Sequence, residues 1–150
     1  MILLALLVIG PVLYLLIAHR GKPGAVPTLL TAFLGGLVVW LATMSWPLGP
    51  HGDYLPWQVV LSGALMVLLT VAATVRCPAV GRPVGWSAAS GFALAWGVWA
   101  FAQDDTGQSG AGLIFLILGA GGSLALVGLI VGALRRRVGR GAAGGRRQAQ

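Results

Sequence analysis

The chain contains very little charge. Only 9% of its 150 residues are Asp, Glu, Lys or Arg, and three of those are acidic. A soluble domain has about a quarter of its residues charged, so this composition excludes an ordinary soluble domain. Disorder is excluded as well, because 57% of the residues are hydrophobic and so apolar a chain cannot stay solvated.

The sequence also lacks the motifs of common catalytic and metal sites. Its single cysteine, Cys77, cannot form an intrachain disulfide. No CxxC, HExxH, GxSxG or GxxxxGK[ST] sequence occurs. We therefore expect no enzyme activity, no catalytic residue, no cofactor and no metal site.

The chain contains five apolar stretches of membrane-spanning length. A window of about 19 residues places them at 2–18, 26–46, 57–75, 84–102 and 110–134. A spanning strand has about 10 residues of alternating polarity, whereas these runs are longer and continuously apolar. The sequence predicts an all-α polytopic transmembrane bundle of five helices. Residues 1–134 form its single domain, residues 135–150 form a basic, flexible cytoplasmic tail, and Pro11 is expected to kink the first helix.

The basic residues all fall on one side of this five-span arrangement. Because basic residues in short loops stay cytoplasmic, the N-terminus is predicted outside, the C-terminus inside, and the first span retained as an anchor. The preference for Arg over Lys, with abundant Ala, Gly and Val, indicates a GC-rich genome and hence a bacterial plasma membrane. The residues assigned to topology and to the headgroups of an anionic inner leaflet are Arg20, Lys22, Arg76, Arg82, Arg135, Arg136, Arg137 and Arg140.

The predicted spans contain no Asp, Glu, Lys, Arg or His. Pumps and proton-coupled carriers keep such groups inside the bilayer for their function, so this absence argues against proton-driven transport. An enzyme acting on lipid stays open as an alternative. Its catalytic groups would have to come from the outer loops, at His51, Asp53, Asp104 or Asp105.

Small residues recur at helical spacing in the last two spans. Such stripes let helix backbones approach closely within a membrane. We expect spans four and five to pack as an antiparallel pair along them. The alternative is that one stripe faces a second copy or another protein. The stripe residues are Gly85, Ala89, Ala93 and Gly97 in span four, and Gly121, Ala125, Gly128 and Gly132 in span five.

Aromatic residues gather toward the outer side of the predicted bundle. Phe92, Trp96 and Trp99 follow one another at i, i+4 and i+7, which places them on one face of span four. Trp40 lies at the same predicted depth as Trp96. If that face turns toward Trp40, the rings could line an outer-leaflet cavity for a flat or cationic apolar ligand. The alternative is that they pack in the core or contact lipid.

The sequence is consistent with two functions. Uncharged spans, small-residue faces and short loops favour a non-catalytic accessory or interaction subunit of a membrane assembly, whose partner is another membrane protein or a second copy. The alternative is a binder, carrier or resistance factor for a hydrophobic small molecule, acting through the outer aromatic cluster. Nucleic acid is not an expected partner, because no aromatic residue interleaves with the C-terminal arginines for base stacking.

Overall fold

The computed structural model describes residues 5–46, 54–103 and 107–148. The described chain is all-helical, with five α-helices, one π-helical turn and one 3₁₀ turn. The elements are η1 (Ala5–Ile9), α2 (Gly10–His19), α3 (Ala25–Met44), α4 (Pro56–Arg76), η2 (Pro78–Val80), α5 (Gly81–Ala102) and α6 (Ser109–Gln148). Proline occupies the first turn of several helices, where its missing N–H breaks no helical hydrogen bond.

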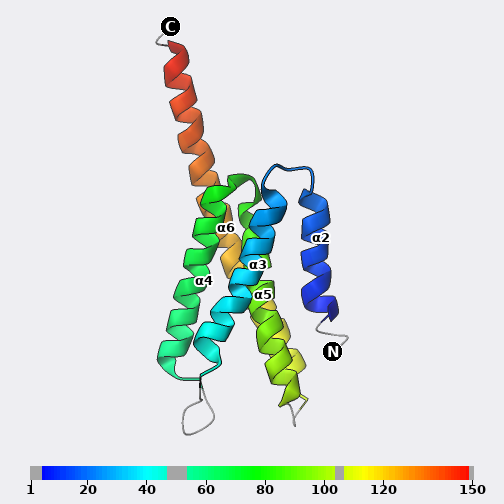
Figure 1. Cartoon of the computed structure of the whole chain (residues 1–150). Coiled ribbons are helices and arrows are strands. Elements are labelled where there is room, and N and C mark those ends of the chain that lie inside the picture. Colours follow the sequence, from blue (N-terminus) through cyan, green and yellow to red (C-terminus); the bar gives the residue numbers. More distant parts are fainter. Residues whose placement is uncertain (1–4, 47–53, 104–106, 149–150) are drawn as a thin grey trace.

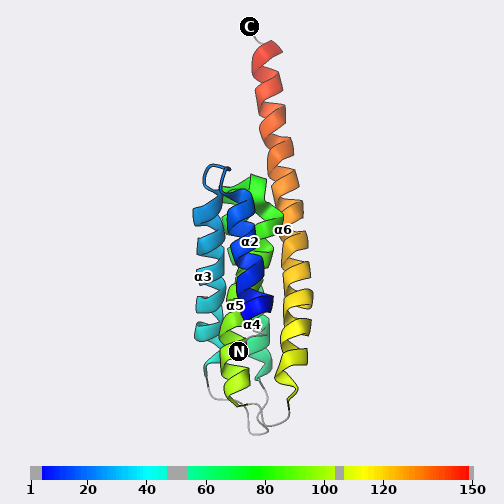
Figure 2. The same cartoon turned by 90° about the vertical axis from the view of Figure 1, so that its right-hand side faces the viewer.

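Helix α5 lies at the centre of the arrangement. It packs along α6 and α3 and more sparsely against α4, while α2 lies to one side against α3 and α5 (Figures 1 and 2). Twelve of its 22 residues are buried, a larger share than in α3 or α4. Helices α3 and α5 run in the same direction, and α4 and α6 run in the opposite one (Figure 1).

The distribution of polarity is the reverse of that in a soluble protein. Large apolar side chains are exposed along the outer helix faces, including Tyr14, Val60 and Phe115. Uncharged polar side chains are buried between helices, including Gln58, Thr70 and Ser87. Three helical stretches are long and apolar enough to cross a membrane: Ala25–Met44, Pro56–Arg76 and Ser109–Val138. This arrangement suggests a membrane location.

Helices α2 and α5 fall outside that set for different reasons. The described part of the first apolar run is short, at Leu6–His19. Helix α5 has 22 residues, but it is rich in Gly, Ala and Ser and carries Arg82 near its start. Small side chains suit a helix surrounded by other helices, because they let the neighbouring backbones approach. They also lower the mean hydropathy of α5, which is the property that marks a helix as a membrane span.

Most helix boundaries lie within three residues of the predicted spans, but the last one does not. The final helix was expected to end at residue 134, whereas α6 continues to Gln148. The stretch beyond Leu134 contains no proline, and its arginines and alanines are good helix formers. Flexibility of the tail stays a prediction. In the first span the π-helical turn ends at Ile9, just before Gly10 and Pro11, which is where the kink was expected.

The predicted small-residue stripes lie in the α5–α6 contact. A Cβ atom added at Gly128 would lie 2.0 Å from the Gly81 carbonyl oxygen, and one at Gly85 would lie 2.3 Å from the Leu124 backbone. On α6, a Cβ at Gly121 would meet the Trp86 ring at 2.5 Å, and one at Gly132 would meet the Pro78 carbonyl oxygen at 2.9 Å. The remaining stripe residues, Ala89, Ala93, Gly97 and Ala125, are buried within the chain.

Candidate functional site

Helices α3 and α5 cross at a contact made of glycines. A Cβ atom at Gly36 would lie 2.0 Å from the Ala88 carbonyl oxygen, and one at Gly91 would lie 1.8 Å from the Phe33 carbonyl oxygen. The two backbones therefore touch at this level. Further toward the C-termini of both helices, the facing side chains include Trp40 of α3 and Trp99 of α5.

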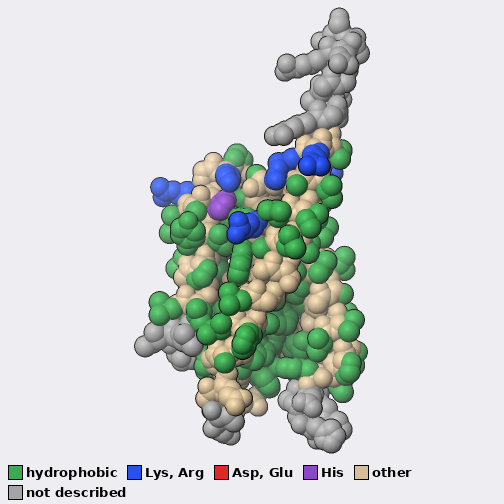
Figure 3. All heavy atoms as spheres, turned by 180° about the vertical axis from the view of Figure 1, so that it is seen from behind, with side chains coloured by type: hydrophobic (Ala, Val, Ile, Leu, Met, Phe, Trp, Pro, Cys, Tyr) green, Lys and Arg blue, Asp and Glu red, His purple; other side chains and the backbone are tan. Residues whose placement is uncertain are grey.

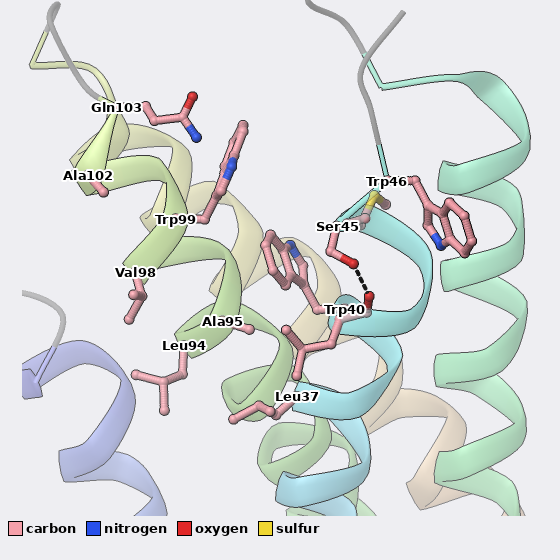
Figure 4. A pocket seen from close by; sticks show the side chains of 12 residues that line it. Leu37, Trp40, Ser45, Trp46, Leu94, Ala95, Val98, Trp99, Ala102 and Gln103 are labelled. Atoms are coloured by element: carbon pink, nitrogen blue, oxygen red, sulfur yellow. Dashed lines mark hydrogen bonds between the residues drawn. The ribbon is translucent and has the colours of Figure 1, made fainter.

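An open groove of about 790 Å³ occupies the space beyond the crossing. Its volume lies within the range of about 300–1,000 Å³ that is usual for small-molecule sites. Figure 4 shows the aliphatic side chains of Leu37 and Leu94 at its deep end and Trp99 and Gln103 at its mouth, whereas the Trp46 ring lies beyond the end of α3, beside α4. The lining residues are Leu37, Trp40, Leu41, Met44, Ser45 and Trp46 from α3 and its C-terminal end, and Leu94, Ala95, Val98, Trp99, Ala102 and Gln103 from α5 and its C-terminal end.

Three aromatic rings pack together at the groove, and two of them, Trp40 and Trp99, form one of its walls. The Trp40 and Trp99 rings have centroids 6.3 Å apart and are tilted by 49°. The Tyr54 ring contacts the Trp99 ring at a centroid distance of 5.8 Å and a tilt of 47°. Trp40 is only 5% exposed, and its indole N–H is buried without a hydrogen-bond partner among the described residues. Tilted pairs at these distances favour stable ring packing, so this wall is preformed.

The mouth of the groove is polar but uncharged in the described residues. The Ser45 hydroxyl donates to the Leu41 carbonyl, and the Trp46 indole donates to the Ala42 carbonyl at 2.8 Å. The exposed Gln103 side chain lies across the groove from them, near Trp99 (Figure 4). Among the described residues, none that lines the groove is Lys, Arg, His, Asp or Glu. The described lining is therefore suited to binding an apolar molecule.

Tyr54 precedes α4 and covers the outer side of Trp99. Burial raises the pKa of its phenol above the ordinary value, and the nearby Trp96 indole offsets part of that rise. The hydroxyl makes no hydrogen bond of normal geometry with the described residues. The phenol thus stays neutral at physiological pH, and Tyr54 serves as an uncharged aromatic wall.

The structure separates the four aromatic residues singled out in the sequence. Trp40 and Trp99 meet in the groove, but Trp96 and Phe92 do not line it. The Trp96 ring packs against α6, where it would lie 2.7 Å from a Cβ atom at Gly112. Phe92 is buried and borders a second pocket of about 360 Å³ between α4 and α6. The expected pairing of Trp40 with Trp96 is thus replaced by a pairing with Trp99, one helical turn further along.

A buried polar stripe on α4 was not anticipated from the sequence. Gln58, Ser62, Thr70 and Thr74 are buried at intervals of four or eight residues, and Met66 occupies the intervening position. The Gln58 side-chain oxygen accepts the Leu55 N–H at 2.7 Å, which caps the helix. The Gln58 amide nitrogen and the Thr74 hydroxyl have no partner among the described residues. Polar residues spaced by four in an apolar span were the signal that could have revealed this inward face.

The described basic side chains lie at the end opposite the groove mouth. Figure 3 shows the described Lys and Arg side chains gathered at this one end of the bundle. Arg136 donates from its guanidinium to the Pro78 carbonyl, which ties α6 to the turn before α5. Arg140 belongs to α6, but its side chain lies outside the described residues.

The loop candidates for lipid chemistry also lie outside the described residues. This holds for His51, Asp53, Asp104 and Asp105. Within the described ranges, no group of three or more His, Cys, Asp or Glu side chains could hold a metal ion. Cys77 is buried at the end of α4, with its thiol 3.9 Å from the Pro23 carbonyl oxygen.

Comparison with protein-family models, with curated proteins and with solved structures found no match to this chain.

Proposed function

We propose that the protein crosses a bacterial plasma membrane with five helices, its N-terminus outside and its C-terminus in the cytoplasm. The gathering of the described basic side chains at one end supports this orientation, because basic residues are retained on the cytoplasmic side. The alternating directions of α2 to α6 support five crossings (Figure 1). The central position of α5 explains how a helix of modest apolarity would cross, since its neighbours shield it from lipid.

We propose further that this membrane protein is not an enzyme and that it binds a hydrophobic small molecule in the α3–α5 groove. The observation that carries the proposal is the groove itself, with its apolar lining and the Trp40–Trp99 wall. In the five-span arrangement its mouth faces the outer leaflet. Binding, or passage between leaflets without an energy source, suits a site with no ionisable side chain among its lining residues.

The test is extraction of C-terminally tagged protein from its native membrane into lipid nanodiscs, followed by mass spectrometry of the retained molecules. We expect one class of lipid or small molecule to be enriched over the bulk membrane. Val98→Trp, which fills the groove, should abolish the enrichment. The matched control is Val60→Trp on the exposed face of α4, which should retain it. Equal retention in both variants would contradict the proposal.

The second candidate is an accessory subunit of a membrane assembly. The observation that favours it is a small-residue patch on the outer face of α6, where Gly119, Gly122 and Ser123 are exposed. A Cβ atom at either glycine would meet nothing within 4 Å, so another helix could approach there. A stoichiometric protein partner in the nanodiscs, or a second copy of the chain, would support this function. Loss of that partner or second copy in Gly122→Ile would show that this patch is the contact surface.

A further inference from the structure

A small cleft lies between α3 and α4 at the end of the bundle opposite the groove. The two helices pack side by side in opposite directions, so the first turns of α3 meet the last turns of α4 (Figure 1). The cleft has a volume of about 200 Å³ and is lined by Pro27, Thr28, Thr31, Ala73 and Arg76. This volume is below the usual range of about 300–1,000 Å³ for a whole small-molecule ligand. The cleft therefore suits the headgroup of a larger molecule.

The cleft gathers the polar side chains of the outer faces of its two helices. Within α3 and α4, the exposed side chains that carry a hydroxyl, amide or charged group are Thr31 and Arg76, and both line the cleft. Thr28 is half-buried one turn earlier on the same face of α3. A polar group on a surface that otherwise contacts lipid is costly unless it has a partner. The convergence of these groups on one cleft therefore points to a polar ligand.

The exposed donors of the cleft have no partner within the described chain. The hydroxyls of Thr28 and Thr43 donate to the carbonyl four residues earlier at 2.7 Å, but the Thr31 hydroxyl forms no such bond to a described residue. The Arg76 guanidinium likewise makes no ion pair or hydrogen bond among the described residues, which include no Asp or Glu. A guanidinium is always charged, and its fork of donors matches a phosphate group. Arg76 and Thr31 together are thus available to a phosphate ester.

The depths of these residues match the layers of a phospholipid. Arg76 is the last residue of α4, whereas Thr28 and Thr31 lie three and six residues after Ala25, the first residue of α3. At 1.5 Å per residue, the two threonines lie about 4.5 and 9 Å further along the helix than Ala25. The headgroup layer of a bilayer is about 5–7 Å thick on each side. The guanidinium therefore lies at the level of the phosphate, and the threonines lie near the glycerol esters.

The surface below the cleft is suited to acyl chains. Leu34 and Val38 continue the face of Thr31 at i+3 and i+7, and their side chains are exposed. A hydrocarbon chain that leaves the cleft toward the middle of the bundle would lie along them. A free phosphate ion would gain nothing from this surface, so the observations favour a lipid as the occupant.

The charge around the cleft selects among phospholipids. The described Lys and Arg side chains gather at this end of the bundle (Figure 3), and they repel the ammonium group of a zwitterionic headgroup. No described carboxylate compensates for that repulsion. A headgroup with net negative charge avoids it.

We propose that the α3–α4 cleft binds an anionic phospholipid, with its phosphate on Arg76 and its glycerol esters toward Thr31. The site is separate from the α3–α5 groove and does not depend on the ligand of that groove. It rests on the proposed orientation only for the leaflet in which the lipid lies, which is the inner one.

The experiment is native mass spectrometry of the full chain released from nanodiscs that contain dioleoyl phosphatidylglycerol and dioleoyl phosphatidylcholine in equal amounts. We expect one phosphatidylglycerol to stay bound, with a preference of at least about five-fold over phosphatidylcholine. Arg76→Gln should abolish this preference. Thr31→Val keeps the shape of the side chain but removes the hydroxyl, and it should lower the preference about two-fold. Both side chains are exposed, so both variants should keep the circular dichroism of the unsubstituted protein.

The matched control is Arg137→Gln, which removes the same charge from an exposed position on α6 outside the cleft and should change the preference little. An equal loss in Arg76→Gln and Arg137→Gln, or retention of both lipids alike or of neither, would overturn the site. Displacement of the bound lipid by inorganic phosphate would assign the cleft to a soluble anion and overturn the lipid as occupant. Val98→Trp fills the α3–α5 groove and should leave the preference unchanged, so failure of that binding function is distinguishable from failure of this site.

Discussion

A methyl group added at Gly128 probes the closest contact between α5 and α6. A Cβ atom there would lie 2.0 Å from the Gly81 carbonyl oxygen, and one at Gly81 would lie 2.2 Å from the Gly128 carbonyl oxygen. Ordinary van der Waals contact begins at 3.4 Å, and a backbone carbonyl cannot rotate out of the way as a side chain can. Gly128→Ala must therefore push the two helices apart.

The expected magnitude follows from the cost of overpacking, which is about 1–3 kcal/mol for an inserted methyl group without room. Little of this is recovered through helix propensity, because helices persist in the unfolded reference state within a bilayer. The matched control is Gly122→Ala, on the exposed face of the same helix, where a Cβ meets nothing within 4 Å. We expect the control to lie within about 0.5 kcal/mol of the unsubstituted protein.

The assay is reversible unfolding in mixed micelles of dodecyl maltoside and increasing dodecyl sulfate, followed by tryptophan fluorescence and circular dichroism. Gly128→Ala should unfold at a lower dodecyl sulfate fraction, with a free energy of unfolding lower by about 1–3 kcal/mol. If Gly128→Ala and Gly122→Ala unfold together with the unsubstituted protein, the backbones of α5 and α6 do not meet at Gly81.

Three further results are expected. A reporter inserted at Gly107 should be active outside the cell and one fused after Gln150 should be active inside, and the reverse pattern would refute the proposed orientation. The buried thiol of Cys77 should react with N-ethylmaleimide slowly in folded protein and quickly in dodecyl sulfate, so equal rates would show that it is accessible. Ser87→Ala removes a buried hydrogen bond of 2.7 Å to the Leu29 carbonyl and should lower the free energy of unfolding by about 0.6 kcal/mol. An unchanged free energy of unfolding in the mixed-micelle assay would show that this hydrogen bond does not stabilise the fold.

Helix positions could be predicted because each span carries its own signal. Continuous apolar runs and prolines in first turns depend only on neighbouring residues, so the starts of α3, α4 and α6 lie within one residue of expectation. The end of α6 could not be predicted in the same way. Loss of apolarity at Arg135 marks where a hydrophobic run stops, but it does not stop helical hydrogen bonding.

The site was harder to predict because it depends on which helix faces meet. The i, i+4, i+7 stripe on α5 groups Phe92, Trp96 and Trp99, yet Trp96 packs toward α6 and Trp99 toward Trp40. The close approach of α3 and α5 at Gly36 and Gly91 sets which faces of these two helices meet. Small residues permit a close approach, but the sequence does not say which of several glycines is used. Tyr54 joins the aromatic wall only through tertiary packing.

The most direct test of the binding function is photo-crosslinking in the living membrane. A photoreactive amino acid at Leu94, on the floor of the groove, is compared with one at Leu68, on the exposed face of α4. After illumination, mass spectrometry identifies the molecules attached to each position. The account predicts that Leu94 captures one class of lipid or small molecule, whereas Leu68 captures bulk lipid. Identical bulk-lipid adducts at both positions would contradict it.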